Sequence, residues 1–303
     1  MIKTYSVKSD FVNSRLDRWY KKNICNVPQS LLEKNLRKGK IKVNNKKEKS
    51  SYKLKIDDKI IIYNFFPKIE HKKKYLEKYM PRKDELTHSS KMIIENNEDF
   101  VIINKPAGIA VQSGTKSKRN IIDILEKTKE FNGIRPFTVH RIDKETSGVL
   151  IVAKNRKFAQ LFTSLFRLRK IYKTYLGITI GELANKKDTF IDDLFYYEGQ
   201  KKIKTRAITS YKVIDSNAKF SLVELHPSTG RKHQLRKQLL IHGCPIYGDS
   251  KYRISDTYKN KNENLMLHAY KISFTINSKK YNFAADLPLY FENFLKQKYL
   301  KNS

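Results

Sequence analysis

In the first 40 residues, apolar residues at helical spacing predict two helices. Pro28 suits the first turn of a helix that carries Leu31, Leu32 and Leu36 on one face, and Gly39 ends it. A shorter helical pattern precedes it around Leu16 and Trp19. After the helices, residues 41–43 alternate between apolar and basic, residues 44–45 form a turn, and residues 59–63 predict a strand.

A second stretch of helical spacing begins after Asn155, which is a suitable N-cap. Its apolar positions lie three and four residues apart, at Phe158, Leu161, Phe162, Leu165 and Phe166. A further helix is predicted over about residues 232–242. The helices of this part of the chain are therefore few and separated by long stretches of another pattern.

That other pattern consists of short, β-branched apolar runs, which are typical of strands. Residues 148–154 are the most apolar of these runs and predict a buried strand, and MIIENNEDFVIINKPAG predicts two strands joined by a turn at Asn96–Asn97. Further strands are expected at residues 172–179, 208–214, 220–225, 265–269, 271–276 and 281–285. Many strands with few helices between them predict an α+β fold with a mixed, mainly antiparallel sheet.

Composition divides the chain into three segments. Residues 1–63 form a small helix–helix–hairpin unit, too small to be a catalytic body. Residues 64–90 are highly charged and poor in apolar residues, which favours a linker, although a solvated extension packed against its neighbours has the same composition. Residues 91–303 are predicted to form the main domain.

The chain is strongly basic, with 63 Lys and Arg against 30 Asp and Glu and a formal net charge of +33. Such an excess costs stability through self-repulsion unless a polyanion offsets it. Nucleic acid is the first partner that the charge indicates and an anionic membrane surface is the second. A coding bias toward lysine, asparagine and isoleucine is the alternative explanation.

Several classes of protein are not expected from this sequence. No apolar run approaches the roughly 20 residues of a membrane-spanning helix, and the first residues contain no apolar core of a secretory signal. Two cysteines fit a reducing compartment, either the cytoplasm or an organelle matrix. No metal-ligand spacing, GxxxxGK or GxGxxG pattern is present, so we expect neither metal nor cofactor.

The first cluster of reactive side chains is HRIDKETSG, residues 140–148, directly before the predicted buried strand. Charged residues at the mouth of such a strand are costly unless they are paired. Asp143 and Arg141 form either an ion pair that caps a turn, or a carboxylate held beside a cation for use as a nucleophile or base.

A second cluster is HPSTGRKHQLRKQLLIHG, residues 226–243. A turn at Thr229–Gly230 opens the predicted helix, which places Arg231, His233 and Arg236 on or near one face of its first turns. This pattern indicates either a basic solvated face or a phosphate site with one arginine turned inward to a buried carboxylate.

Two tyrosines add a third feature. In IYKTYLG, Tyr172 and Tyr175 fall on opposite faces of a strand. We expect one of them to pack in the core and the other to face a site, where a tyrosine stacks on a base or transfers a proton.

The motifs occur in the order NKPAGIAVQSG, HRIDKETSGVLIVAK, KIYKTYLG, PSTGRKHQLR, HGCPIYGD and LMLHA. Together they resemble the RluA family of pseudouridine synthases. SRLD, VPQSLLEKNLRKGKIKVN and IDDKIII resemble the S4-type RNA-binding module that precedes the catalytic domain in many members. The module's usual VNG and Gly-Asp turns are replaced by residues 43–45, VNN, and by Asp57–Asp58, whose side chains tolerate left-handed backbone.

The resemblance implies an enzyme that isomerises uridine to pseudouridine within RNA, without metal or cofactor, in the cytoplasm and as a monomer. By resemblance, Asp143 is the catalytic carboxylate, acting on the ribose C1′ or on departure of the base, and Arg236 pairs with it. Tyr175 contacts the base and Leu267 packs the pocket. Arg141 enters the RNA stack, and His140 and Arg231 bind RNA beside it.

The first segment is expected to bind structured RNA through basic residues around its helices and hairpin, which include Arg15, Arg18, Arg37, Lys38, Lys40 and Lys42. The S4-type module favours large-subunit ribosomal RNA as the substrate. A synthase acting on transfer RNA and a non-catalytic RNA-binding factor in ribosome assembly are the alternatives. A general binder of polyanions or membrane surfaces would need neither Asp143 nor the ordered motifs.

Overall fold

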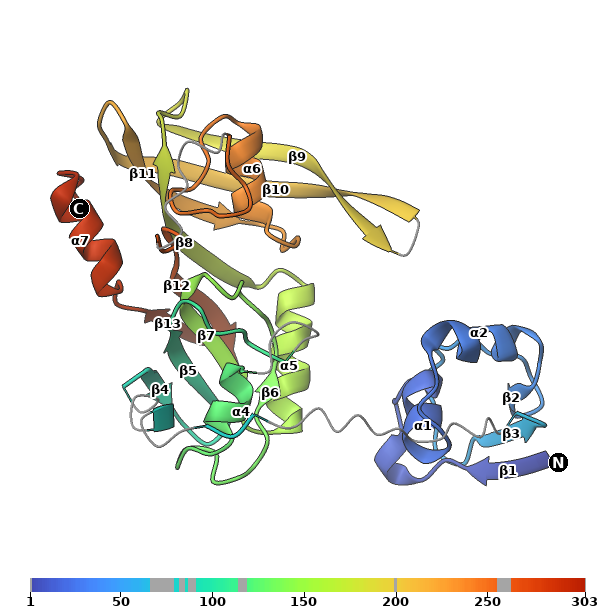
Figure 1. Cartoon of the computed structure of the whole chain (residues 1–303). Helices are drawn as coiled ribbons and strands as arrows, with labels where there is room; N and C mark the ends of the chain where they lie inside the picture. The colour runs from blue at the N-terminus through green and yellow to red at the C-terminus, as the bar shows by residue number, and fades with distance from the viewer. Residues whose placement is uncertain are drawn as a thin grey trace. The chain divides into compact units, whose positions relative to one another are not determined.

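The computed structural model describes residues 2–65, 79–81, 85–86, 91–113, 119–198, 201–254 and 263–302. The chain divides into two compact units, Met1–Lys74 and Tyr75–Ser303. Figure 1 colours the first unit blue and runs through green to red along the second. The predicted linker, residues 64–90, lies largely outside the described residues. Of its described residues, Phe65 is buried in the core of the first unit, and Tyr79 and Leu86 pack against a core of the second.

The first unit is a three-stranded antiparallel sheet with helices beside it. Its strands follow the order β1-β3-β2, and its elements are β1 (Ile2–Ser6), the 3-10 turn Ser9–Phe11, α1 (Leu16–Asn23), α2 (Gln29–Arg37), β2 (Ile41–Val43) and β3 (Lys59–Tyr63). Trp19 and Tyr20 of α1 and Leu32 and Leu36 of α2 are buried in the core. Both predicted helices and the strand at residues 59–63 are confirmed. β1 was not predicted, because its largely exposed residues show no alternation.

Two turns of the first unit need left-handed backbone. Asn44, Asn45 and Asp57 have φ of +47°, +65° and +61°. Asp58 then joins the two turns, because its carboxylate accepts hydrogen bonds from Asn44 Nδ2 and from the backbone N–H of Lys55, each at 2.8 Å. The expectation that asparagine and aspartate keep these turns is confirmed.

The second unit is built on one mixed sheet. Its strands are β4 (Ile93–Asn96), β5 (Phe100–Lys105), β6 (Phe137–Thr138), β7 (Ser147–Ala153), β8 (Ile171–Ile180), β9 (Lys187–Glu198), β10 (Lys201–Ser216), β11 (Phe220–Pro227), β12 (Leu267–Ile276) and β13 (Lys279–Ala284). They pair in the order β4-β5-β7-β12-β8-β11-β10-β9, with β13 on β12 and β6 on β7. Only the β12–β7 pairing is parallel among those described, so the predicted α+β fold with a mainly antiparallel sheet is confirmed.

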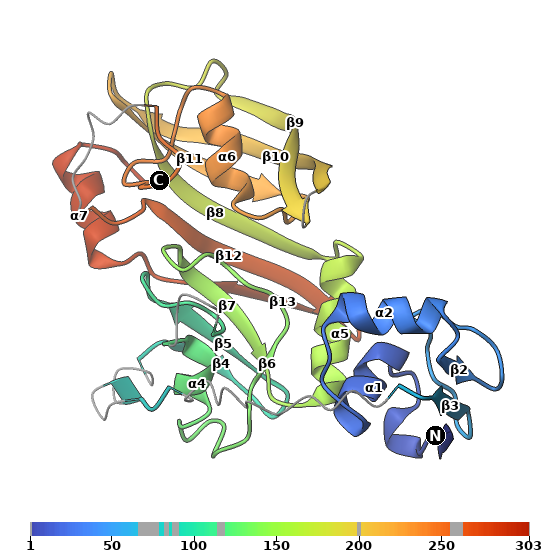
Figure 2. The same ribbon diagram turned by 45° about the vertical axis from the view of Figure 1, so that its right-hand side comes forward.

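Helices cover both faces of the sheet (Figure 2). They are α4 (Ile121–Leu125), α5 (Arg156–Arg167), α6 (Gln234–Ile241) and α7 (Leu289–Gln297). The side chain of Asn155 caps α5 as predicted, because it accepts a hydrogen bond from the backbone N–H of Phe158 at 2.9 Å. Alternate residues of β7 explain its unbroken apolar run: Val149 and Ile151 join the core beneath α5, and Leu150 and Val152 join the core beneath α4.

Several elements differ from the predictions. Residues 265–269 and 271–276 are not two strands; β12 runs through them with a bulge between Ala269 and Lys271. β10 begins at Lys201, well before the predicted residue 208, and pairs with β9, which was not predicted. Both strands carry polar residues where they leave the body of the sheet, and these residues hide the apolar alternation. The helices α4 and α7 were also missed.

Candidate active site

A cavity of about 1270 Å³ opens in the second unit. Most of its lining comes from three parts of the chain: the loop before β7, the end of α5 with the start of β8, and residues 226–236, which run from the end of β11 into α6. Every candidate that the sequence singled out in this unit lies along it, namely His140, Arg141, Asp143, Tyr172, Tyr175, Arg231, His233, Arg236 and Leu267. The fold therefore gathers motifs that are separated by more than 100 residues.

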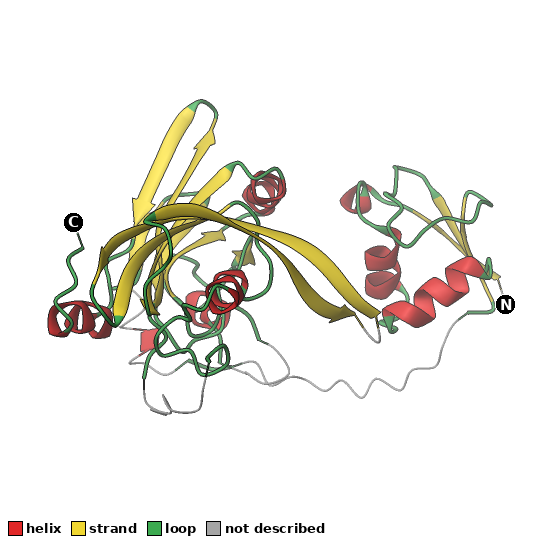
Figure 3. Cartoon of the chain, turned by 90° about the horizontal axis from the view of Figure 1, so that it is seen from above, coloured by secondary structure: helices red, strands yellow, loops and turns green. Residues whose placement is uncertain are grey.

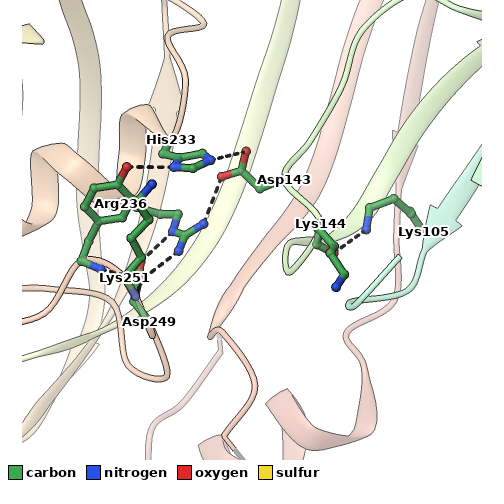
Figure 4. Close-up of polar contacts among 8 residues, drawn as sticks. Lys105, Asp143, Lys144, His233, Arg236, Asp249 and Lys251 are labelled. Atoms are coloured by element: carbon green, nitrogen blue, oxygen red, sulfur yellow. Dashed lines mark hydrogen bonds and ion pairs between the residues drawn. The ribbon is translucent and has the colours of Figure 1, made fainter. Parts of the chain in front are cut away.

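Asp143 lies in the loop before β7, and 24% of its side chain is exposed to the cavity. One carboxylate oxygen is 3.4 Å from Nη1 of Arg236, and the other is 3.7 Å from Nε2 of His233 (Figure 4). The carboxylate therefore faces two nitrogen-bearing side chains from the opposite wall and keeps an edge open to the cavity.

The loop that carries Asp143 ends in TSG, and its glycine, Gly148, lies where β7 comes closest to β12. Its φ is +109°, and a Cβ at this position would lie 2.2 Å from the carbonyl oxygen of Ala269. Only glycine lets β7 approach β12 this closely. Ser147 fixes the same approach, because its hydroxyl bonds Nδ1 of His268 at 2.8 Å in the buried interior.

Lys105, which the sequence did not single out, holds the loop from behind. Its amine is fully buried and donates to the carbonyls of Pro106, Ile109 and Lys144 at 2.7, 3.0 and 3.2 Å. Figure 4 shows the contact with Lys144. Burial lowers the pKa of Lys105 to about 7, although Glu145 and Asp143 act against this shift. A lysine at the end of the apolar run FVIINK was the available signal, since a buried lysine must find acceptors.

Arg236 has a second, closer partner. Its Nε and Nη2 donate to the two oxygens of Asp249 at 2.6 and 2.7 Å, and the Asp249 side chain is fully buried. This two-pronged pair leaves Nη1 for Asp143. The predicted inward arginine is thus present, and the buried carboxylate that anchors it is Asp249, which the sequence did not identify.

His233 lies opposite Asp143 with strained backbone. Its φ of +53° and ψ of +35° are left-handed, and α6 begins only at Gln234, so Arg231 and His233 precede the helix instead of lying on its first turns. Nδ1 of His233 bonds the hydroxyl of Tyr252 at 2.9 Å. Burial lowers the pKa of His233, and Arg236 adds to this shift, whereas the carboxylate of Asp143 opposes it.

Gln234 holds the turn that precedes α6. Its side-chain oxygen accepts from the hydroxyl of Thr229 at 2.7 Å and from the backbone N–H of Arg231 at 2.9 Å. The side chain of Arg231 is exposed and donates from Nε to the carbonyl of Arg206 at 3.1 Å. Arg231 is also among the residues that line the cavity.

The structure does not divide the two tyrosine roles as predicted. Tyr175 packs against apolar core residues and also lines the cavity, whereas Tyr172 is 71% exposed at its edge. Burial raises the pKa of the Tyr175 phenol, and the charge of Asp143 raises it further. Tyr175 is accordingly a neutral phenol beside the carboxylate at neutral pH.

Comparison with known proteins identifies this arrangement. Residues 99–240 match the family model for RNA pseudouridylate synthase. Proteins named ribosomal large subunit pseudouridine synthase C, from Buchnera aphidicola subsp. Schizaphis graminum and from Rickettsia felis, are each 33% identical. The first alignment covers 95% of both chains, and the second covers 92% of this chain and 95% of its relative. This chain is an RNA pseudouridine synthase of the RluA family.

A solved structure agrees with this family. Human RNA pseudouridylate synthase domain containing 4 is 26% identical, with a TM-score of 0.62, over 71% of this chain and 95% of that one. The resemblance drawn from the ordered motifs is therefore confirmed. The synthase is an isomerase, and its substrate and product contain the same atoms.

The synthase's remaining cavity candidates have different surroundings. Arg141 is exposed on the cavity wall, and Leu267, at the start of β12, is buried there. His140 also lines the cavity, but its Nε2 accepts a hydrogen bond from the backbone N–H of Ile151 at 2.9 Å, and its ring stacks on Phe166. Burial lowers the pKa of His140 to about 3, with Lys173 adding to the shift. These contacts favour a structural role for His140 over the predicted RNA contact.

Five of the six basic residues named for RNA binding in the first unit are exposed; Lys42 is half-buried, and its amine lies 5.3 Å from the centre of the Tyr63 ring. Arg37, Lys38 and Lys40 lie at and just after the end of α2. Arg15 differs from them, because it pairs with Asp17 at 2.6 Å and this contact occupies its guanidinium.

Within the described ranges, no three His, Cys, Asp or Glu side chains gather as a metal site requires. No helix in the described part of the chain is both long and apolar enough to cross a membrane.

Proposed function

We propose that this synthase modifies uridine in large-subunit ribosomal RNA. The supporting observation is that relatives named for this substrate align along 95% of this chain, so the similarity includes the first unit as well as the catalytic one. The net charge of +33 fits a large, folded polyanion. Transfer RNA is the second candidate substrate, because the chemistry at the uridine is the same.

We assign Asp143 the catalytic role at the ribose C1′. It is the one carboxylate of the described cavity lining, and Tyr175 and Arg236 lie beside it. A target uridine must first leave the RNA stack at a cost of a few kcal/mol. The exposed Arg141 is placed to fill the vacated position, since a guanidinium stacks and donates hydrogen bonds together. Arg231 then meets phosphate, and Leu267 packs against the flipped base.

Release of tritium from RNA labelled at uridine C5 tests substrate and role together, because joining C1′ to C5 expels that hydrogen. Wild type is expected to release tritium from unmodified large-subunit ribosomal RNA. Asp143→Asn keeps the shape of the site and should lower turnover at least about a thousandfold while RNA binding is retained. Release from transfer RNA alone would keep the mechanism and overturn the substrate. Tight RNA binding without release from either would support the assembly-factor alternative.

We further propose that the first unit is an S4-like RNA-binding domain that uses Arg37, Lys38 and Lys40. Each is an exposed cation on one end of α2 or the chain directly after it. Replacing all three by glutamine should weaken binding to ribosomal RNA and flatten its dependence on salt. Replacement of Arg15, which already pairs with Asp17, is the matched control and should change binding less. Equal effects would contradict the assignment.

The synthase is proposed to act in the cytoplasm as a monomer. Both of its cysteines, Cys25 and Cys244, are buried, which fits a reducing compartment. Light scattering during gel filtration tests the monomer, and a mass near twice 35.7 kDa would overturn it.

A further inference from the structure

The C-terminal helix α7 meets the end of the loop that carries Asp143. Figure 3 shows this helix beside the sheet, and its Phe291 and Phe294 are buried in a core of the second unit. Tyr290, the second residue of α7, is half-buried, and its hydroxyl lies 3.2 Å from Oγ of Ser147, the first residue of β7. A helix near the end of the chain therefore contacts the strand that directly follows the loop.

This contact is one end of a continuous chain of hydrogen bonds. Oγ of Ser147 lies 2.8 Å from Nδ1 of His268, and Nε2 of His268 lies 3.1 Å from the carbonyl oxygen of Ala285. Ser147 and His268 are both buried. The chain thus begins at Tyr290 on α7, passes through the starts of β7 and β12, and returns to Ala285 shortly before the helix.

Each bond of the chain has one possible direction. A carbonyl oxygen only accepts, so Nε2 of His268 carries a proton and donates it to Ala285. Burial lowers the pKa of His268 to about 4, although Ala285 and Asp286 oppose this shift, so the ring is neutral at neutral pH and Nδ1 is unprotonated. Nδ1 therefore accepts from the hydroxyl of Ser147, which uses its single proton. The hydroxyl of Tyr290 must then donate to Oγ of Ser147.

The chain acts at the base of the loop that carries Asp143. Ser147 and His268 face each other in the parallel pairing of β7 with β12. The N–H of Thr146, one residue before Ser147, donates to the main-chain carbonyl of Asp143 at 3.2 Å. A shift of Ser147 therefore passes through one residue to the backbone of Asp143.

A buried polar chain at this point fixes geometry more closely than apolar packing does. Hydrogen bonds are directional, and a fully satisfied buried network holds its members in one arrangement. Ser147, His268 and Tyr290 are not among the residues that line the described cavity. An effect of the chain on catalysis must therefore pass through the loop, and contact of these side chains with RNA in the cavity is not required.

We propose that Tyr290 is a positioning residue for Asp143, which acts through Ser147 and makes the C-terminal helix necessary for full turnover. The hydroxyl of Tyr290 holds Oγ of Ser147, Ser147 holds β7 in register with β12, and the loop before β7 presents Asp143 to the ribose. This inference rests on the proposed role of Asp143, and it adds an element that the sequence motifs do not contain.

Tyr290→Phe tests the positioning role, because it removes the hydroxyl and keeps the ring. We expect kcat for tritium release to fall about three- to tenfold, the effect of one lost hydrogen bond, while Kd for the same RNA stays within about twofold of wild type. Tyr299→Phe, which removes an exposed hydroxyl from the same end of the chain, is the control and should not change kcat. A lower free energy of unfolding with unchanged kcat would show a purely structural role and overturn the proposal.

A double-mutant cycle tests whether Tyr290 acts through Ser147. Ser147→Ala removes both hydrogen bonds of the serine and should lower kcat at least as much as Tyr290→Phe. Adding Tyr290→Phe to Ser147→Ala should then change kcat by less than about twofold, because the connection is already broken. Two losses that multiply would overturn the proposed route. Chemical denaturation of the same four proteins ensures that kcat is compared among folded enzymes.

Nuclear magnetic resonance of protein labelled with 15N in histidine tests the direction of the chain and needs no variant of Ser147. We expect His268 to carry a proton on Nε2 and none on Nδ1 at neutral pH. A protonated Nδ1 would require Ser147 to accept from the ring, and this would overturn the assigned order of donors.

The outcome is separable from that of the proposed function, because all turnover is measured on RNA that wild type modifies. Full activity of Asp143→Asn would overturn the proposed role of Asp143. The cycle would still decide whether Tyr290 and Ser147 act together on turnover, and the histidine signals would still decide the order of the chain.

Discussion

The wall of the cavity that carries Asp143 and the wall that carries Arg236 differ in what holds them. Behind Asp143, the loop is fixed by main-chain contacts: Lys105 gathers three carbonyls, and Gly148 lets two strands touch. Behind Arg236, the fixing groups are side chains, with Asp249 clamping the guanidinium and Tyr252 bonding His233. The proposed catalytic carboxylate of Asp143 is thus positioned by packing and main-chain contacts, whereas the groups around it are positioned by charged and polar side chains.

The difference predicts how each wall fails. The wall that carries Asp143 should be disrupted by a steric clash at Gly148 or by loss of the Lys105 amine, which donates to three carbonyls. Either change should lower stability and alter the geometry of the loop together. A wall held by charged side chains fails by leaving a buried charge without compensation, and pH and salt affect it more strongly. Four substitutions separate these two behaviours.

The largest effect is expected from Asp249→Asn. The amide oxygen of the variant can still accept a hydrogen bond, but Asp143 at 3.4 Å would be the one charged partner left to the buried Arg236 guanidinium among the described residues. Removal of one charge of a buried pair costs about 3–5 kcal/mol. Chemical denaturation measures this cost as a lower free energy of unfolding. Asp193→Asn, which removes an acid from an exposed pair with Lys204, is the control and should cost less than about 1 kcal/mol. Similar costs for both would mean that the clamp does not stabilise this wall.

Gly148→Ala is expected to follow, with a decrease in stability of about 3 kcal/mol or more from strained backbone and the clash with Ala269. Gly230→Ala on the other wall is the control. Its φ is not left-handed, and a Cβ there meets nothing within 4 Å, so its stability should change by no more than about 0.5 kcal/mol. Thermal unfolding of both variants decides whether the close approach of β7 to β12 is as tight as described.

Lys105→Met should cost about 1–3 kcal/mol, because the carbonyls of Pro106 and Ile109 lose this donor and that of Lys144 keeps only the N–H of Gly108 among the described donors. We expect kcat to fall while RNA affinity is kept. The effect depends on pH in a specific direction. The pKa of Lys105 is about 7 in the folded protein against 10.5 in the unfolded chain, so between these values the unfolded chain binds more protons. The stability of wild type relative to Lys105→Met should therefore rise as pH increases from about 7 to 10.5. A difference that falls over this range would contradict the buried, deprotonating amine.

Tyr252→Phe is expected to have the smallest effect. It removes one hydrogen bond to Nδ1 of His233, worth about 0.5–1.5 kcal/mol, and it leaves the Arg236–Asp249 pair intact. Turnover should fall by about two- to tenfold, and the free energy of unfolding should fall by no more than about 1.5 kcal/mol. Unchanged turnover would show that the orientation of His233 does not depend on Tyr252.

Much of the fold could be predicted because the decisive signals are local. Asn155 and the apolar positions after it specify α5, and the unbroken apolar run at residues 148–154 specifies β7. β9 and the distal part of β10 could not be found in this way, since their outward residues are polar or isolated apolar ones. The two strands predicted at residues 265–269 and 271–276 correspond to one strand, β12, which has a bulge between Ala269 and Lys271 in its pairing with β8. Pairing with a distant strand cannot be predicted from a local pattern.

The candidate site divides in the same manner. Asp143, Tyr175 and Arg236 stand in motifs, so the sequence alone nominates them. Lys105 and Asp249 also stand in quoted motifs, NKPAGIAVQSG and HGCPIYGD, but residue types do not reveal their partners. Only the fold shows that Lys105 reaches the carbonyl of Lys144 and that Asp249 reaches Arg236. The hydrogen bond that His140 accepts from the N–H of Ile151 could not be predicted, because a backbone partner leaves no trace in residue types.

The place of β12 in the sheet has a consequence for biosynthesis. β7 and β8 do not pair with each other, and β12 lies between them. As the chain leaves the ribosome, the half-sheet with Asp143 and the half-sheet with Arg236 are both made before residue 267, yet nothing in the sheet joins them until β12 arrives. We therefore expect Asp143 and Arg236 to remain unjoined by the sheet until β12 has been made. Because His268 pairs with Ser147 across more than 100 residues, we also expect this pairing to form late in folding and to complete the cavity.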